Sequence, residues 1–157
     1  MKLNRRLVLA GTAAGVAVVA GATTIALANP GNTVTQIIGH RATLSDSVQV
    51  NDDRIKFQTK DAVDMITQKV TFPAGGTSGW HYHPGVVLVV VESGNVTTHD
   101  ANCQTKTYGP GEAFVESGTD PFMVSNETAV DAVDIATIAS PAGGPFRIET
   151  DPPPCAN

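Results

Sequence analysis

The sequence predicts an all-β fold, a sandwich or barrel of short strands behind an N-terminal signal or anchor helix. Three observations support this class. Residues 86–92 form a long, mostly β-branched run, other short segments alternate apolar and polar residues, and glycine- and proline-rich turns separate them at regular spacing. A chain of 157 residues without internal repeats has room for one such domain.

The N-terminus predicts export. Lys2, Arg5 and Arg6 form a basic start, and residues 7–28 are apolar, uncharged and end in Ala-Leu-Ala. This layout is typical of a bacterial secretory signal cleaved after residue 28, and the arginine pair also resembles a twin-arginine signal. The alternative is an uncleaved anchor, because the stretch is long enough to span a bilayer. We therefore expect a secreted, periplasmic or cell-envelope protein.

The remaining chain divides by composition. The predicted parts are an export signal at 1–28, a disordered linker at 29–40, a β-barrel at 41–150 and a Pro-rich tail at 151–157. Without the signal, seven basic and fifteen acidic residues remain, a net charge of −8. This acidic balance argues against nucleic acid and anionic membrane surfaces as partners.

Each predicted strand is an apolar or alternating segment bounded by a turn. Residues 86–92 are apolar at consecutive positions, which is typical of a strand covered on both faces. A tight turn at Gly94 then leads into a hairpin. We expect strands at 48–50, 55–59, 65–72, 86–92, 96–99, 112–116, 122–125 and 130–139.

Two histidines one residue apart are the clearest functional signal. His81 and His83 stand in Gly-Trp-His-Tyr-His-Pro-Gly, directly before residues 86–92. Alternate residues of a strand share a face, so both imidazoles are expected to point the same way. Neutral imidazole nitrogens bind zinc, iron or manganese. A catalytic site needs a third protein ligand, however, and the two histidines alone do not supply it.

The segment at residues 75–126 resembles the two sequence motifs of the cupin superfamily, which are small jelly-roll barrels. Four residues stand at the positions of the first motif: Gly75, His81, His83 and Gly94. The position of the metal-binding glutamate in that motif falls on Val87 or, with one residue more, on Leu88. In place of a metal ligand, the chain thus carries an apolar side chain.

The second motif is also incomplete. Gly111 and Asn126 fit it, whereas Phe122 stands where the family has its fourth metal ligand, a histidine. Ser117 and Thr119 replace the proline and glycine of that motif. The resemblance implies a cupin-type jelly roll with a degenerate metal site. It also allows a homodimer, since cupins often dimerise.

The degenerate motifs favour non-catalytic binding of a small, partly apolar anion or sugar derivative inside the barrel, without a cofactor. The histidines would anchor the ligand by hydrogen bonds. The pocket residues implied by the resemblance are His81, His83, Val87, Phe122 and Asn126.

Two alternatives remain open. The first is a metal-dependent oxygenase or isomerase that binds iron, manganese or zinc through His81 and His83. A third ligand would then come from one of four residues outside the family ligand positions: His99, Asp120, Glu116 or His40. The second alternative is a secreted structural or interaction domain with a vestigial pocket.

Cys103 and Cys155 are the only two cysteines. In an exported protein such a pair predicts a disulfide. This bond would join the Pro-rich tail to the barrel. A redox-active pair is disfavoured because the cysteines are far apart in sequence and form no C-x-x-C motif.

Overall fold

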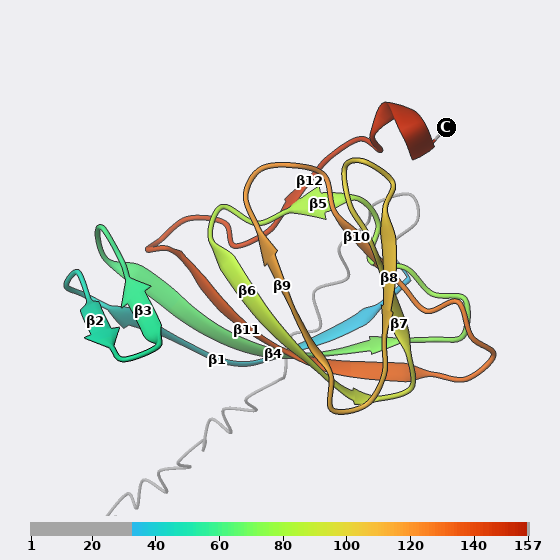
Figure 1. The fold of residues 1–157 in the computed structure, drawn as a ribbon, viewed down its shortest axis with the longest axis horizontal. Helices are drawn as coiled ribbons and strands as arrows, with labels where there is room; N and C mark the ends of the chain where they lie inside the picture. The colour runs from blue at the N-terminus through green and yellow to red at the C-terminus, as the bar shows by residue number, and fades with distance from the viewer. Residues whose placement is uncertain (1–32, 157) are drawn as a thin grey trace, which may run out of the picture.

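Two facing β-sheets build the computed structural model, which describes residues 33–156 (Figure 1). One sheet has five strands in the order β1-β4-β11-β6-β9. Opposite it lie the three strands β10-β7-β8, and the pair β12-β5 continues this layer through a bridge between His81 and Phe122. The predicted all-β class is confirmed. The elements are β1 (Thr35–Leu44), β2 (Gln49–Asp52), β3 (Ile55–Gln58), β4 (Val63–Phe72), β5 (His81–Tyr82), β6 (Val86–Ser93), β7 (Val96–His99), β8 (Thr105–Tyr108), β9 (Ala113–Ser117), β10 (Met123–Ser125), β11 (Ala132–Pro141), β12 (Ile148–Glu149) and the 3-10 helix η1 (Pro154–Ala156).

The core lies between the two sheets. Strand side chains alternate between the faces of a sheet, so β6 turns every second valine inward. Burying these side chains removes apolar surface from water, which is the main stabilising contribution to a core of this kind. The buried apolar residues are Ile66, Val70, Phe72, Val87, Val89, Val91, Val96, Phe114, Val124, Ala132, Ala136 and Ile138.

The outer face of β6 differs from the sequence prediction. Its residues were expected to be covered on both faces, yet Val86, Leu88 and Val90 are 42%, 52% and 49% exposed. The outer face of the five-stranded sheet is thus largely uncovered among the described residues, and residues 56–61 border one part of it. Val115 and Ile135 of the neighbouring strands extend this exposed apolar surface. The homodimer stays a prediction.

Strand β1 corrects the predicted linker. Residues 35–40 were expected to be disordered, but they open β1, which pairs antiparallel with β4 from Thr35 opposite Thr71 to Leu44 opposite Val63. Backbone hydrogen bonds hold this edge strand. Its side chains are almost all exposed, which explains why the sequence lacks a clear alternating pattern there. The predicted signal at 1–28 and residues 29–32 lie outside the described residues.

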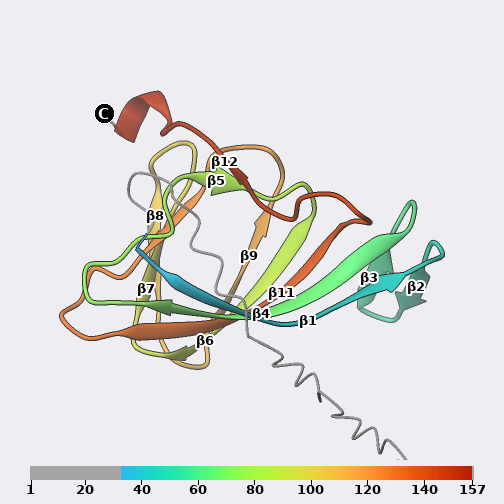
Figure 2. The ribbon, with the colours of Figure 1, turned by 180° about the vertical axis from the view of Figure 1, so that it is seen from behind.

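The C-terminal tail is fixed to the barrel. A disulfide joins Cys103, between β7 and β8, to Cys155 in η1, so the predicted pairing is confirmed. The hairpin of β2 and β3 projects from the opposite end of the molecule (Figures 1 and 2). Within residues 33–156, no helix is long and apolar enough to cross a membrane.

A buried aspartate ties β4 to its surroundings, and its substitution should change the acid stability of the protein. The carboxylate of Asp64 accepts hydrogen bonds from Thr43, Arg41 and the backbone N–H of Gly143, in that order of effect, which lowers its pKa from 3.8 to about 2. A carboxyl whose pKa is lower in the folded state stabilises the fold above the unfolded pKa. This stabilisation is lost as the pH falls from about 4 to about 2.

We therefore expect Asp64→Asn to lower the stability at neutral pH and to flatten the pH dependence between about 4 and 2. Urea unfolding at a series of pH values measures both effects. Asp52→Asn, on the exposed hairpin, is the matched control and should retain the wild-type profile. An unchanged profile in Asp64→Asn would contradict this role.

Candidate metal centre

His81 and His83 enter the barrel from β5 and the residue after it. The backbone of His81 pairs with Phe122 on one side and with Glu149 of β12 on the other, which fixes the segment between two neighbours. Both imidazoles turn inward as their spacing predicts, and the residues are only 2% and 5% exposed. Gly85 then allows a close crossing, since a Cβ there would lie 1.9 Å from the carbonyl oxygen of Ala139.

Backbone carbonyls set the tautomer of both rings. His81 Nδ1 donates to the carbonyl of Gly79 at 2.9 Å, and His83 Nδ1 donates to that of Phe146 at 2.5 Å. A carbonyl oxygen can only accept, so each neutral ring carries its proton on Nδ1 and has a lone pair on Nε2. Burial has the largest effect on the pKa of His81. It lowers this pKa and thereby favours the neutral ring.

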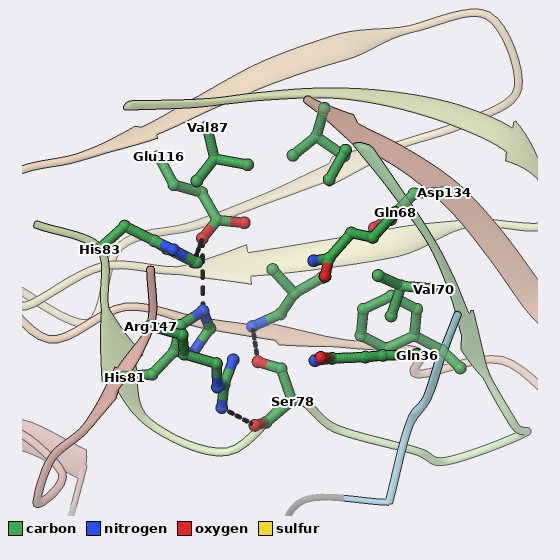
Figure 3. Close-up of a pocket in the computed structure, with 14 residues that line it drawn as sticks. Gln36, Gln68, Val70, Ser78, His81, His83, Val87, Glu116, Asp134 and Arg147 are labelled. Atoms are coloured by element: carbon green, nitrogen blue, oxygen red, sulfur yellow. Dashed lines mark hydrogen bonds and ion pairs between the residues drawn. The ribbon is translucent and has the colours of Figure 1, made fainter. Parts of the chain in front are cut away.

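Glu116 of β9 supplies the third donor. It lies directly opposite Val87 in the pairing of β6 with β9, and both side chains point inward (Figure 3). Its Oε2 lies 3.4 Å from Nε2 of His81 and 3.2 Å from Nε2 of His83. The neighbouring strand therefore places a carboxylate across from the valine that occupies the motif's glutamate position.

When both rings are neutral, the three donor atoms face one another with no hydrogen between them. Burial alone would raise the pKa of Glu116, but the hydrogen bonds and positive charge that the two histidines offer when they carry a proton on Nε2 outweigh it and lower the pKa to about 2, so the group is a carboxylate. Its buried Oε2 has no well-formed hydrogen bond. Two lone pairs on nitrogen and one carboxylate oxygen thus converge where a cation is needed to hold them together.

The spacing of the donors suits a metal ion. Two atoms that each lie about 2.1 Å from one ion are about 3.0–3.4 Å apart at octahedral and tetrahedral angles. The distances from Glu116 Oε2 fall in or near this range, and all three donors lie within 4.8 Å of one another. Among residues 33–156, this is the one His/Cys/Asp/Glu cluster with such spacing. His81, His83 and Glu116 could therefore hold a metal.

A small cavity of about 30 Å³ opens beside the three donors (Figure 3). Gln68 and Asp134 also line it, and Gln68 Oε1 and Asp134 Oδ1 are buried without a hydrogen-bond partner. Burial, followed by the charge of Glu116, raises the pKa of Asp134 to about 8. The other residues around the cavity are Gln36, Val70, Phe72, Ser78, Val87, Val89, Val124, Ala136 and Arg147.

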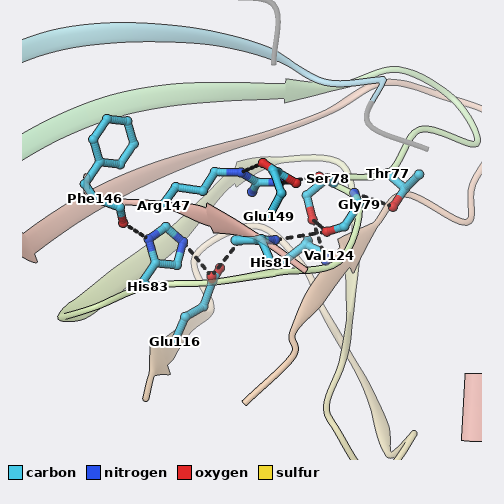
Figure 4. A network of polar contacts seen from close by, with 10 residues as sticks. All are labelled: Thr77, Ser78, Gly79, His81, His83, Glu116, Val124, Phe146, Arg147 and Glu149. Atoms are coloured by element: carbon cyan, nitrogen blue, oxygen red, sulfur yellow. Dashed lines mark hydrogen bonds and ion pairs between the residues drawn. The ribbon is translucent and has the colours of Figure 1, made fainter. Parts of the chain in front are cut away.

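The C-terminal segment closes one side of the site. Arg147 donates to the carbonyl of Ser78 at 2.6 Å and pairs with Glu149, and the neighbouring Phe146 holds His83 (Figure 4). This network joins β12 to the loop before β5. The sequence pattern gave no sign of these contacts, because they connect segments about 65 residues apart.

Two of the predicted pocket residues lie elsewhere. Val87 lines the cavity as expected, but Phe122 and Asn126 do not. The Phe122 ring packs near Phe114, with 6.5 Å between the ring centroids. The Asn126 side chain is buried and donates to three backbone carbonyls, so it fixes the chain around β4 and β11.

Of the four residues considered for the third ligand, only Glu116 joins the cluster. His99 bonds to Ser125 and lies near Glu127, while His40 and Asp120 are exposed. A sequence signal for Glu116 did exist. It shares strand parity with Phe114, whose ring is buried in the core, so an inward carboxylate could have been inferred.

Comparisons with known proteins agree with this fold. The family model described as "Cupin domain" matches residues 68–136. The polyketide cyclase RemF from Streptomyces resistomycificus has 13% identity and a TM-score of 0.54, over 80% of this chain and 77% of its own. No curated protein matches.

Two further similar structures match this chain over less than half of their own length. A structure of the DMSP lyases RdDddP and RnDddQII has 19% identity and a TM-score of 0.48, over 59% of this chain and 46% of its own. Recombinant oxalate oxidase has 18% identity and a TM-score of 0.47, over 54% and 45%. The chain spans about half the length of these two proteins. The family match identifies a cupin domain at residues 68–136, and the two facing sheets and the inward His-x-His pair of the structure agree with it.

Proposed function

We propose that this protein is a metal-dependent cupin enzyme in which His81, His83 and Glu116 bind one iron, manganese or zinc ion. A single observation carries the proposal: the buried Glu116 Oε2 faces two Nε2 lone pairs at 3.2 and 3.4 Å and has no hydrogen bond of its own. With both rings neutral and no metal bound, this arrangement leaves a buried carboxylate poorly compensated.

The size of the cavity supports a metal site more than a binding pocket for a partly apolar molecule. Pockets for drug-sized ligands measure about 300–1,000 Å³. The barrel cavity measures about 30 Å³, and a single water needs about 10–15 Å³ on this measure. The interior thus has room beside the three donors for a ligand of only a few atoms.

The set of donors favours oxygenase chemistry. Two histidines and one carboxylate form the ligand set of non-haem iron oxygenases, which leaves positions open for small ligands. When bound, the ion supplies Lewis acidity and, if it is iron or manganese, redox chemistry. The chain orients both rings through the carbonyls of Gly79 and Phe146, which places the lone pair of each neutral ring on Nε2, and it shields the site from bulk water.

We also propose that the protein acts outside the cytoplasm. The basic start and apolar stretch at residues 2–28 support an export signal. The disulfide between Cys103 and Cys155 supports an oxidising compartment.

Metal titration of the full chain tests the proposed centre. Chelator-treated protein should bind about one equivalent of Fe²⁺, Mn²⁺ or Zn²⁺, and His83→Ala should lose this binding because it removes one of three ligands. His99→Ala is the matched control, since His99 also lies beside a carboxylate but outside the cluster. Wild-type protein that binds none of the three metals, or equal binding by His83→Ala, would refute the proposal.

A further inference from the structure

Two polar side chains interrupt the apolar inner faces of β4 and β11. Gln68 lies between Ile66 and Val70 on the inward side of β4, and Asp134 lies between Ala132 and Ala136 on β11. In the strand pairing, Gln68 is opposite Ala136 and Asp134 is opposite Val70, so the two are diagonal neighbours on one face. Both residues line the cavity beside the metal cluster (Figure 3).

Packing does not explain why these two polar side chains are buried. Gln68 and Asp134 are 7% and 3% exposed, yet Gln68 Oε1 and Asp134 Oδ1 have no hydrogen-bond partner among residues 33–156. A buried, unsatisfied polar group destabilises a fold, and an apolar side chain of similar size would avoid that cost. Two such oxygens beside one cavity indicate a partner that enters the cavity.

We propose that Gln68 and Asp134 form a binding subsite, here named the acceptor wall, that hydrogen-bonds the N–H or O–H end of a small ligand of the metal centre. This subsite rests on the metal site proposed above and extends it with residues that are not ligands. The chemistry follows from the two atoms. The two unpartnered atoms, an amide oxygen and a carboxyl oxygen, can each accept a hydrogen bond, so a ligand that donates satisfies them.

The cavity volume limits the size of this ligand. At about 30 Å³ it holds the equivalent of about two or three waters, which corresponds to a hydroxyl- or amino-bearing group of about that many non-hydrogen atoms. The negative charge of Glu116 at the opposite side is compensated when the metal is bound. The acceptor wall then determines which small ligands occupy the open side of the centre.

Two probes of similar size test the proposal. Hydroxylamine carries donors at both ends, whereas azide has none, and both bind metal ions. The full chain loaded with Co²⁺ under anaerobic conditions reports binding of either probe through its visible absorption. We expect Gln68→Leu and Asp134→Leu to weaken hydroxylamine at least about 10-fold relative to azide, as the loss of one buried hydrogen bond does.

Gln36→Leu is the matched control, because Gln36 lines the same cavity but is not one of the buried unsatisfied groups. It should retain the wild-type ratio of the two affinities. Both test variants should still bind one Co²⁺, since neither residue is a ligand, and should unfold at or above the wild-type temperature without metal. An unchanged affinity ratio, or variants that unfold at lower temperature, would overturn the acceptor wall. Loss of Co²⁺ binding by the wild type would instead refute the metal site.

Discussion

Replacing Glu116 with glutamine is expected to weaken metal binding by at least about 100-fold. Glutamine has the same size but lacks the charge, and its amide offers a poorer donor than a carboxylate. Mutation of residues that only hydrogen-bond to metal ligands already lowers metal affinity by about 10–100-fold. Loss of a direct ligand should therefore lower it by at least about 100-fold. The change should be large because Glu116 is the only anionic member of the cluster.

Thermal and chemical unfolding provide a second readout of the same change. Metal at about 100 times its dissociation constant stabilises a protein by about 2.7 kcal/mol if it binds only the folded state. Wild-type protein should gain this stability and Glu116→Gln almost none. Glu127→Gln removes a carboxylate beside His99, 3.2 Å from its ring, and is expected to behave as the wild type. Equal metal affinity in Glu116→Gln and wild type would exclude Glu116 as a ligand.

Much of the barrel could be predicted from local sequence patterns. The strands that carry the core, such as β4, β6 and β11, show apolar residues at alternate positions and end at glycine- or proline-rich turns. The exposed strands β2 and β3 were predicted as well, at 48–50 and 55–59, but four other elements were missed. β1 and β8 expose most of their side chains, and β5 and β12 have two residues each, so backbone pairing alone defines them.

Two of the three donors in the metal cluster could be identified from the sequence. The His-x-His spacing identified two donors, because residues on one strand follow a fixed alternation. The third donor depends on how β9 pairs with β6. That register is set by the whole sheet, and it places Glu116 opposite Val87. The family motif places its glutamate at a position where this chain has Val87. In the folded site the carboxylate comes instead from Glu116 on the neighbouring strand.

Removal of the disulfide should lower the free energy of unfolding by about 4 kcal/mol. The bond closes a loop between residues 52 positions apart, and the chain-entropy model assigns about this stabilisation to a loop of that length. The loop includes β8 to β12 and therefore Glu116, Asp134 and the segment from Phe146 to Glu149 that closes the site. Without the bond, the unfolded chain gains freedom that folding must remove.

Cys103→Ser combined with Cys155→Ser removes the bond without leaving a reactive thiol, and urea unfolding measures the loss. Metal stoichiometry should stay the same, because hydrogen bonds of Arg147 to Ser78 and of His83 to Phe146 still hold the closing segment in the folded state. The disulfide thus stabilises the protein by restricting the unfolded chain, whereas the geometry of the metal centre depends on contacts within the folded state. A loss below about 1 kcal/mol would contradict the entropic account. A double variant that folds but binds no metal would show that the tail bond itself positions the ligands.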